Sequence, residues 1–286
     1  TLSDPSRHPG SKAAVMIPGW WCGRKAGLLS LIAAIVLGTA ITSSLAQSKT
    51  CVLPSQHTGM TFPVEQIDAN WACRLQPIID HYTTANKVGP LRTPLPKFVY
   101  FYLLDRPPLA AGLINRLDLG LYKSEARGPG RFWGDDGEGT SGIVELVHQD
   151  SSHRVYYLEG SHDSAVLPHV TGRAVVLVKM NAMKDGQGND GMETTLVAYT
   201  KLDSRILAGL ASLIRPLIGS TVARKLTKGI EVVNRLGQEM RQHPDRVLFE
   251  AVDPPSLADD EVAFLKQALK SMRASTGATR SRTSSP

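Results

Sequence analysis

The chain has 286 residues, of which 42% are hydrophobic and 20% are charged, and its formal net charge is +6. This composition excludes an intrinsically disordered protein and is enough for one hydrophobic core of ordinary size. Four basic residues and one acidic residue fall in the first 46 positions, so the rest of the chain carries 28 basic and 25 acidic residues. Because the chain has no cluster of Lys and Arg interleaved with aromatic residues, we expect no nucleic-acid partner.

The first predicted element is an export signal at residues 1–46. Arg24 and Lys25 precede an apolar segment at 28–41, which is followed by small and polar residues. A basic flank, a short apolar segment and small residues at its end are the parts of a secretory signal. Cleavage is expected between Ala46 and Gln47, which predicts a periplasmic or envelope-associated protein.

Met16 gives a basic flank of ordinary length, so we expect residues 1–15 to be a start-site artefact. The alternative to cleavage is an uncleaved membrane anchor, because the uncharged stretch at 26–48 has 23 residues and can span a bilayer.

Cys51 and Cys73 are the two cysteines that follow the signal, and they are candidates for a disulfide. Exported proteins occupy oxidising compartments, where paired cysteines form disulfides. The bond would close a loop of about 22 residues and stabilise the fold by about 3 kcal/mol on the chain-entropy model. Two unpaired thiols are the alternative.

The next part of the chain is expected to be helical. Apolar residues at helical spacing predict a helix over 67–82, and a linker rich in Pro and Gly follows at 88–96. The aromatic run at 97–104 fits a helix or a strand equally well. Pro107 and the apolar spacing after it predict a second helix, which ends near Gly120.

A series of short strands is predicted in the middle of the chain. Runs of β-branched and aromatic residues are separated by polar turns that include 135–139 and 185–191. Consecutive strands joined by short turns indicate an antiparallel meander. The six runs are 122–127, 131–133, 142–148, 154–159, 173–180 and 194–200.

The C-terminal part is expected to return to helix. One helix is predicted over 204–215, where Pro216 interrupts it. Ser220 is expected to cap a long amphipathic helix that runs to about 242. A last helix is expected from Ser256 to 272. The predicted units are an export signal at 1–46, a helical extension and linker at 47–95, a central domain at 96–243, a helical addition at 244–273 and a disordered tail at 274–286.

The order of these elements resembles the helix-grip fold of the START-like superfamily, which includes polyketide cyclases (the SRPBCC proteins). The resemblance rests on a helix pair, about six strands and the closing helix, which runs from Leu202-Asp203 through Arg215-Pro216-Leu217 to Met240. It implies an α+β fold in which a curved antiparallel sheet wraps a long C-terminal helix. It also implies an apolar ligand held between the sheet and that helix.

Several aromatic and apolar residues are candidates for contact with this ligand. Aromatic residues on strands are also common in ordinary cores, which is the competing interpretation. The predicted ligand-binding residues are Trp133, Tyr156, Tyr157, Tyr199, Leu226 and Ile230.

No catalytic residue is identified, and we expect no cofactor and no metal. Four histidines, at 148, 153, 162 and 169, lie close together in sequence, but none of their spacings places two ligands on one helix face. The acidic residues at 135–139 are surrounded by glycines, which indicates a hairpin turn rather than a catalytic carboxyl pair.

The preferred hypothesis is an exported, non-enzymatic protein that binds a hydrophobic small molecule or lipid and contacts a membrane. One alternative is an envelope hydrolase or cyclase that uses the region His148–His169. The other is a structural or assembly partner that docks through 244–272; the sequence names no protein partner.

Overall fold

The computed structural model describes residues 51–163, 169–203 and 211–283, and it has the α+β architecture expected from the sequence. Ala46 and Gln47, the residues of the predicted cleavage site, lie outside the described residues. Within the described ranges, no helix is long and apolar enough to cross a membrane.

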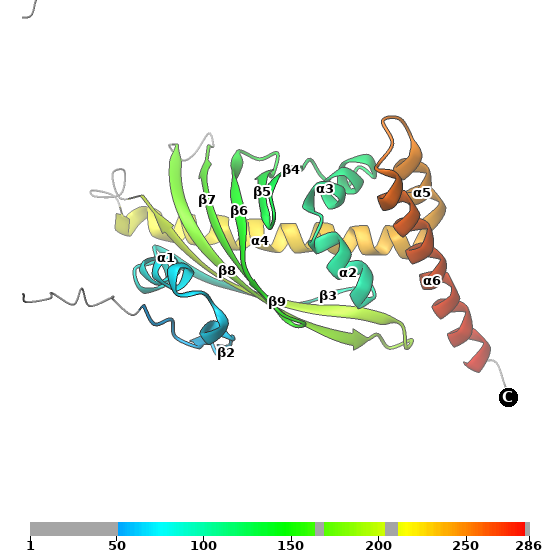
Figure 1. The fold of residues 1–286 in the computed structure, drawn as a ribbon, viewed down its shortest axis with the longest axis horizontal. Coiled ribbons are helices and arrows are strands. Elements are labelled where there is room, and N and C mark those ends of the chain that lie inside the picture. The colour runs from blue at the N-terminus through cyan, green and yellow to red at the C-terminus, as the bar shows by residue number, and fades with distance from the viewer. Residues whose placement is uncertain (1–50, 164–168, 204–210, 284–286) are drawn as a thin grey trace, which may run out of the picture. The chain divides into compact units, whose positions relative to one another are not determined.

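A seven-stranded antiparallel sheet forms the centre of the fold. Its spatial order is β3-β9-β8-β7-β6-β5-β4 (Figure 1). The strands of this sheet that come first and last in the sequence, β3 and β9, therefore lie side by side. The strands are β3 (Thr84–Thr93), β4 (Lys123–Gly128), β5 (Arg131–Asp135), β6 (Thr140–Gln149), β7 (His153–His162), β8 (Val170–Lys184) and β9 (Asp190–Leu202). The six runs that the sequence predicts as strands correspond to β4 to β9.

Three helices lie on one face of this sheet. The pair α2 (Lys97–Leu104) and α3 (Pro107–Arg116) joins β3 to β4, and the long helix α4 (Ala211–Gln242) follows β9. Val176 and Ala198 of the sheet share a core with residues of α2, α3 and α4. We call the face that carries these two residues the inner face. A curved sheet against a long C-terminal helix is the helix-grip arrangement (Figure 1).

The opposite face, which we call the outer face, is covered by the N-terminal part of the chain. Val175 and Tyr199 of the sheet pack against α1 (Ala69–Asp80). Successive residues of a strand point to opposite faces, so Val175 and Val176 can belong to two different cores. Before α1, strands β1 (Gln56–His57) and β2 (Met60–Thr61) form a small hairpin, followed by the short helix η1 (Val64–Gln66).

The expected disulfide is present at the start of this N-terminal part. Cys51 and Cys73 are joined by an S–S bond of 2.01 Å, with their Cα atoms 5.0 Å apart. Cys73 lies in α1, so the bond ties the segment before β1 to the helix that covers the outer face.

Residues 88–93 of strand β3 were expected to be part of a linker, and this expectation is wrong. β3 pairs with β9 and forms one edge of the sheet, and its register shifts between Val88 and Leu91. An edge strand tolerates Gly89 and Pro90 because one of its sides needs no ladder hydrogen bonds. β3 therefore belongs to the sheet, although it precedes residue 96, where the central domain was expected to begin.

The aromatic run 97–104, left open between helix and strand, is the helix α2. Val99, Tyr100 and Leu103 are buried on one of its sides, at the spacing of a helix face. Its aromatic residues favour a strand by propensity, but packing of this face against the inner face of the sheet decides for a helix.

Helix α4 is longer than expected and continues through Pro216. Pro216 removes one backbone hydrogen bond without ending the helix. Ser220 is not an N-cap, because its Oγ donates to the Leu217 carbonyl oxygen at 2.9 Å within the helix. Of the helix expected over 204–215, residues 204–210 lie outside the described ranges.

Two helices follow α4. The helical addition expected at 244–273 consists of two helices, α5 (Pro244–Val252) and α6 (Asp259–Thr283), and α6 extends into the expected tail at 274–286. Val247 of α5 and Leu265 of α6 are fully buried in the core that also contains α4. The apolar side of this C-terminal addition is therefore used within the chain itself.

Candidate ligand-binding cavity

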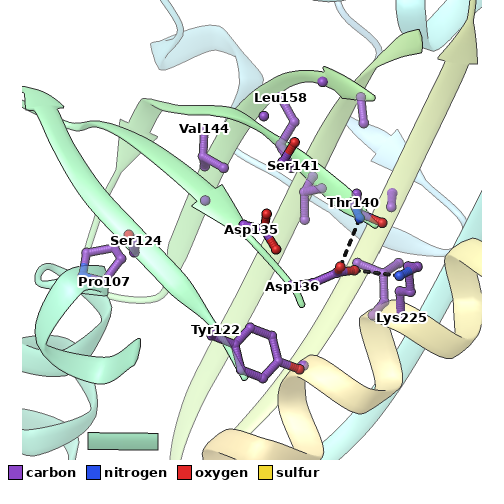
Figure 2. Close-up of a pocket in the computed structure, with 18 of the residues that line it drawn as sticks. Pro107, Tyr122, Ser124, Asp135, Asp136, Thr140, Ser141, Val144, Leu158 and Lys225 are labelled. Carbon is purple, nitrogen blue, oxygen red and sulfur yellow. Dashed lines mark hydrogen bonds and ion pairs between the residues drawn. The ribbon is translucent and has the colours of Figure 1, made fainter. Parts of the chain in front are cut away.

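A cavity of about 610 Å³ lies between the inner face of the sheet, the helix pair α2–α3 and the long helix α4. It extends along α4 from Ile218 to Leu236. Figure 2 shows part of its wall, with Val144 and Leu158 on neighbouring strands and Lys225 on α4. Its volume is within the range of about 300–1,000 Å³ that is usual for small-molecule sites.

Most of the cavity wall is apolar, and each surrounding layer contributes to it. The helix pair supplies Leu103, Leu104, Ala110 and Ile114; the sheet supplies Val144, Leu158, Ala174, Val176 and Ala198; and α4 supplies Val222, Leu226, Val232, Val233 and Leu236. Side chains from three layers converge on one space without filling it. An apolar ligand that entered this space would lose its contact with water, which is favourable.

Four glycines form a row across the inner face. Gly134, Gly142, Gly160 and Gly172 are register partners on the adjacent strands β5, β6, β7 and β8, and all four line the cavity. Neighbouring strands are about 4.8 Å apart, so the row is about 14 Å long. Along this length, the cavity is bounded by peptide backbone rather than by side chains.

The two central glycines of the row are required by the close approach of neighbouring strands. A Cβ added at Gly142 would lie 2.4 Å from the Glu159 carbonyl oxygen. A Cβ at Gly160 would lie 2.4 Å from the Ser141 carbonyl oxygen. Glycine inside a strand often marks a tight bend or a close backbone contact, and both effects help the sheet curve around α4.

Gly229 on α4 lies on the other side of the cavity and has a different explanation. A Cβ added there would meet no atom within 4 Å, and the residue lines the cavity. Glycine in the interior of a helix costs about 1 kcal/mol relative to alanine. Steric clashes therefore do not explain why residue 229 is glycine. The missing side chain leaves the cavity wider at this level of α4.

Charged groups meet at one side of the cavity, where the β5–β6 turn touches α4. Lys225 Nζ lies 2.5 Å from Asp136 Oδ2 and 3.6 Å from Glu138 Oε2 (Figure 2). Asp136 Oδ1 also accepts the backbone N–H groups of Glu138, at 2.8 Å, and of Thr140, at 2.9 Å. Lys228 forms an ion pair with Glu138, so two lysines of α4 hold the turn.

The pKa of Asp136 is lowered by these partners. Burial alone raises it, but the hydrogen bonds from Lys225, Thr140 and Glu138 together outweigh the burial. Asp136 therefore stays ionised and keeps its ion pair with Lys225 at neutral pH. This ion pair fixes the β5–β6 turn against the cavity side of α4.

The structure places the predicted ligand-binding residues in different locations. Leu226 lines the cavity, whereas Trp133, Tyr156 and Ile230 are not part of its wall. Tyr157 and Tyr199 lie in the core between the outer face and α1. Among the predicted residues, the structure therefore brings only Leu226 to the cavity.

Tyr156 lies on the same side of the sheet as the cavity. It packs against the core of the inner face, and burial raises its pKa to about 12. Its neighbour Arg154 is buried and forms an ion pair with Asp105, at 2.6 Å, just beyond the end of α2. These residues attach α2 to β7 beside the cavity.

The histidines at 148 and 153 lie around the β6–β7 turn. His153 Nδ1 is 3.1 Å from Asp150 Oδ2, and His148 Nε2 is 3.8 Å from the same oxygen. Burial raises the pKa of Asp150, but hydrogen bonds from Ser152 and His153 lower it to about 2. These contacts organise a turn, and neither histidine lines the cavity.

The other two histidines of the group are separated from this turn. His162 lines the cavity, and its Nδ1 lies 3.0 Å from Thr140 Oγ1. His169 is exposed and pairs with Asp163 at 2.7 Å. Within the described residues, no three His, Cys, Asp or Glu side chains are placed to hold a metal ion.

The sequence patterns did not reveal the glycine row, Gly229 or the ion pair of Lys225. Each glycine lies at the end of a predicted strand. Gly134 and Gly160 immediately follow the predicted strands 131–133 and 154–159, Gly142 begins the strand 142–148, and Gly172 precedes the strand 173–180. The strands in fact continue through all four positions. Their shared location near the ends of four predicted strands was the available signal.

No protein-family model matches the sequence, and no curated protein matches it. Among solved structures, a conserved protein from Geobacillus kaustophilus is similar over 54% of this chain and 95% of its own, with 10% identity and a TM-score of 0.40. A point mutant of norcoclaurine synthase from Thalictrum flavum, in complex with a transition-state analogue, is similar over 55% of this chain and 96% of its own, with 14% identity and a TM-score of 0.34. A protein from Thermus thermophilus is similar over 54% of this chain and 96% of its own, with 15% identity and a TM-score of 0.34. Similarities of this size carry no functional argument, so the cavity itself is the basis for a function.

Proposed function

We propose that this chain is an exported protein that binds an apolar small molecule or a lipid in the cavity between its sheet and α4. The observation that carries the proposal is the cavity of about 610 Å³ with a mostly apolar wall. Burial of apolar surface contributes about 25 cal/mol per Å², so a ligand of matching size would gain affinity from burial alone.

The glycine at 229 supports a cavity that is kept open. Protein interiors are close-packed, and an unfilled apolar space lowers stability. An alanine at 229 would meet no clash and would also favour the helix. The protein nevertheless has glycine at 229, without the better helix propensity and the better packing that alanine would give. This is expected if a ligand completes the packing of the cavity.

The disulfide supports an oxidising compartment. Disulfides are rare in the reducing cytosol and common in exported proteins. The Cys51–Cys73 bond lies a few residues after the expected cleavage site between Ala46 and Gln47. Export, membrane contact and a periplasmic or envelope location remain proposals that rest on the predicted signal and on this bond.

The experiment that tests the proposal is native mass spectrometry of the full-length chain expressed with its own N-terminal segment. The protein is purified from the cell envelope, and the bound material is identified by lipid extraction. We expect a protein that begins at Gln47 and carries an apolar adduct at a ratio near one to one. Purified protein without adduct should also bind phenylnaphthylamine, an uncharged dye that fluoresces in apolar surroundings.

A pair of variants on the same helix makes the test specific for the cavity. Gly229→Phe places a large side chain into the cavity and should abolish both the adduct and dye binding. Gln238→Phe adds the same side chain to an exposed position of α4 and should change neither. The proposal is refuted if the wild-type protein binds neither lipid nor dye, or if the two variants bind dye equally well.

A further inference from the structure

The cavity has a lysine in its wall, but this lysine is already occupied. The Lys225 side chain is 19% exposed, and its ammonium group donates to Asp136 Oδ2 at 2.5 Å and to the Glu138 carbonyl oxygen at 3.4 Å. The Glu138 carboxylate lies 3.6 Å away as a second anion. An ammonium group has three donors, so little capacity remains for a ligand.

The partner carboxylate is as firmly held as the lysine. Asp136 accepts two backbone N–H groups at Oδ1 and Lys225 at Oδ2. A ligand carboxylate could reach Lys225 only by displacing Asp136, which would leave an unpaired anion in the turn. Leaving a largely buried charge without its partner is unfavourable, so the ion pair excludes an anionic group from this part of the wall.

Three other charged residues of the cavity wall do not replace Lys225. Lys123 is exposed, where an ion pair contributes little. Arg173 forms an ion pair with Asp203 at 3.3 Å. Asp135 accepts the N–H group of Gly137 at 2.7 Å. Within the described part of the chain, none of these groups offers an unpaired, buried cation to a ligand.

Uncharged hydroxyl groups are nevertheless available in the cavity wall. Tyr122 and Ser124 of the β4 region both line the cavity, and Figure 2 shows Ser124 beside Pro107. Ser124 is the register partner of Gly134, so its hydroxyl group lies at the end of the glycine row. Within the described residues, no hydrogen bond occupies the hydroxyl group of Tyr122 or Ser124.

We propose, on the basis of the proposed function, that the ligand has an apolar body and an uncharged polar end, such as a hydroxyl or carbonyl group. The polar end meets the hydroxyl groups of Tyr122 and Ser124, and the body lies along the glycine row and the apolar side of α4. The closed Asp136–Lys225 ion pair discriminates against a carboxylate of the same chain length.

The test compares two ligands that differ only in the polar end. Dodecanol and dodecanoate are used at neutral pH to displace phenylnaphthylamine from the full-length protein. We expect dodecanoate to bind at least about tenfold more weakly than dodecanol, because its carboxylate would be buried without a donor of opposite charge. Wild-type protein that binds dodecanoate as tightly as dodecanol would overturn the inference.

Asp136→Asn tests the cause of this preference. The asparagine side chain can still accept the two backbone N–H groups, but it leaves Lys225 with a weaker partner. Dodecanoate affinity should rise about tenfold, while dodecanol affinity stays within about twofold. Glu138→Gln changes a half-exposed residue, so it serves as a second variant if Asp136→Asn does not fold, and it should shift dodecanoate in the same direction.

The control is Asp185→Asn in the β8–β9 turn. Asp185 Oδ1 accepts the N–H groups of Gln187 and Asn189, which is the same arrangement of i+2 and i+4 donors as at Asp136. It is not part of the cavity wall, so neither affinity should change. An equal rise in dodecanoate affinity in the Asp136 and Asp185 variants would overturn the inference. If dye, dodecanol and dodecanoate all fail to bind, the proposed function is itself refuted.

Discussion

Replacing Gly229 by alanine should stabilise the protein, although the residue lies in the interior of a helix that faces the core. The added Cβ would meet no atom within 4 Å, so the substitution creates no clash. Alanine is favoured over glycine in a helix interior by about 1 kcal/mol. The expected gain in the free energy of unfolding is therefore about 1 kcal/mol.

Thermal unfolding followed by circular dichroism measures this gain. A change of about 1 kcal/mol corresponds to an increase in Tm of about 2–4 °C for a domain of 150–250 residues. Ligand must be removed beforehand, because a bound ligand raises the Tm of the wild-type protein and would mask the difference.

Gly237 provides the contrast on the same helix. A Cβ at this position would lie 3.0 Å from Leu95 Cγ and 3.3 Å from Pro94 Cδ, so crowding opposes the gain in helix propensity. Gly237→Ala should leave the Tm unchanged or lower it. If Gly229→Ala also lowered the Tm, the space next to Gly229 would not be open, and the reasoning that links this glycine to the cavity would be refuted.

Three further substitutions test other parts of the structure. Gly160→Ala places a Cβ 2.4 Å from backbone of β6 and should destabilise the fold by about 1–3 kcal/mol, measured by urea unfolding; an unchanged midpoint would contradict the close approach of the strands. Replacing Cys51 and Cys73 by serine should cost about 3 kcal/mol, and the Tm of the wild-type protein should fall towards that of the variant when reductant is added. Because the pKa of Asp136 is lowered on folding, its contribution to stability is complete above the unfolded-state value of about 3.9 and is lost as the pH falls through the folded-state value. Asp136→Asn should therefore lower stability at neutral pH and flatten the loss of stability below about pH 4; an unchanged acid profile would show that the ion pair contributes nothing.

The sequence was sufficient to predict the order of most elements. The alternation of β-branched residues with polar turns located six strands, and the spacing of apolar residues located α1, α3 and most of α4. These patterns are local, because the period of a helix or strand is set by backbone geometry within a few residues. The disulfide was predictable for a similar reason: only two cysteines follow the predicted signal, so one pairing is available between them.

Strand β3 could not be predicted because its identity depends on a partner about 100 residues away in the chain. Its Gly and Pro residues are unfavourable for a strand in isolation. Pairing with β9, from Thr84 opposite Thr200 to Thr93 opposite Met192, makes it an edge strand of the sheet. The same limit applies to Tyr157 and Tyr199, whose face depends on the register of the whole sheet.

By itself, the sequence determined the class of fold, the amphipathic helices and the single disulfide, because each follows from local periodicity or from residue count. Only the tertiary structure decided that four glycines align in one row, that Lys225 meets Asp136 across 89 residues of chain, and that an apolar space stays unfilled beside Gly229. The physical reason is that register, ion pairing and cavity volume depend on distances between segments that are far apart in the chain. A filled core and a hollow one can have the same hydrophobic pattern, and they differ only in how the side chains of different elements meet.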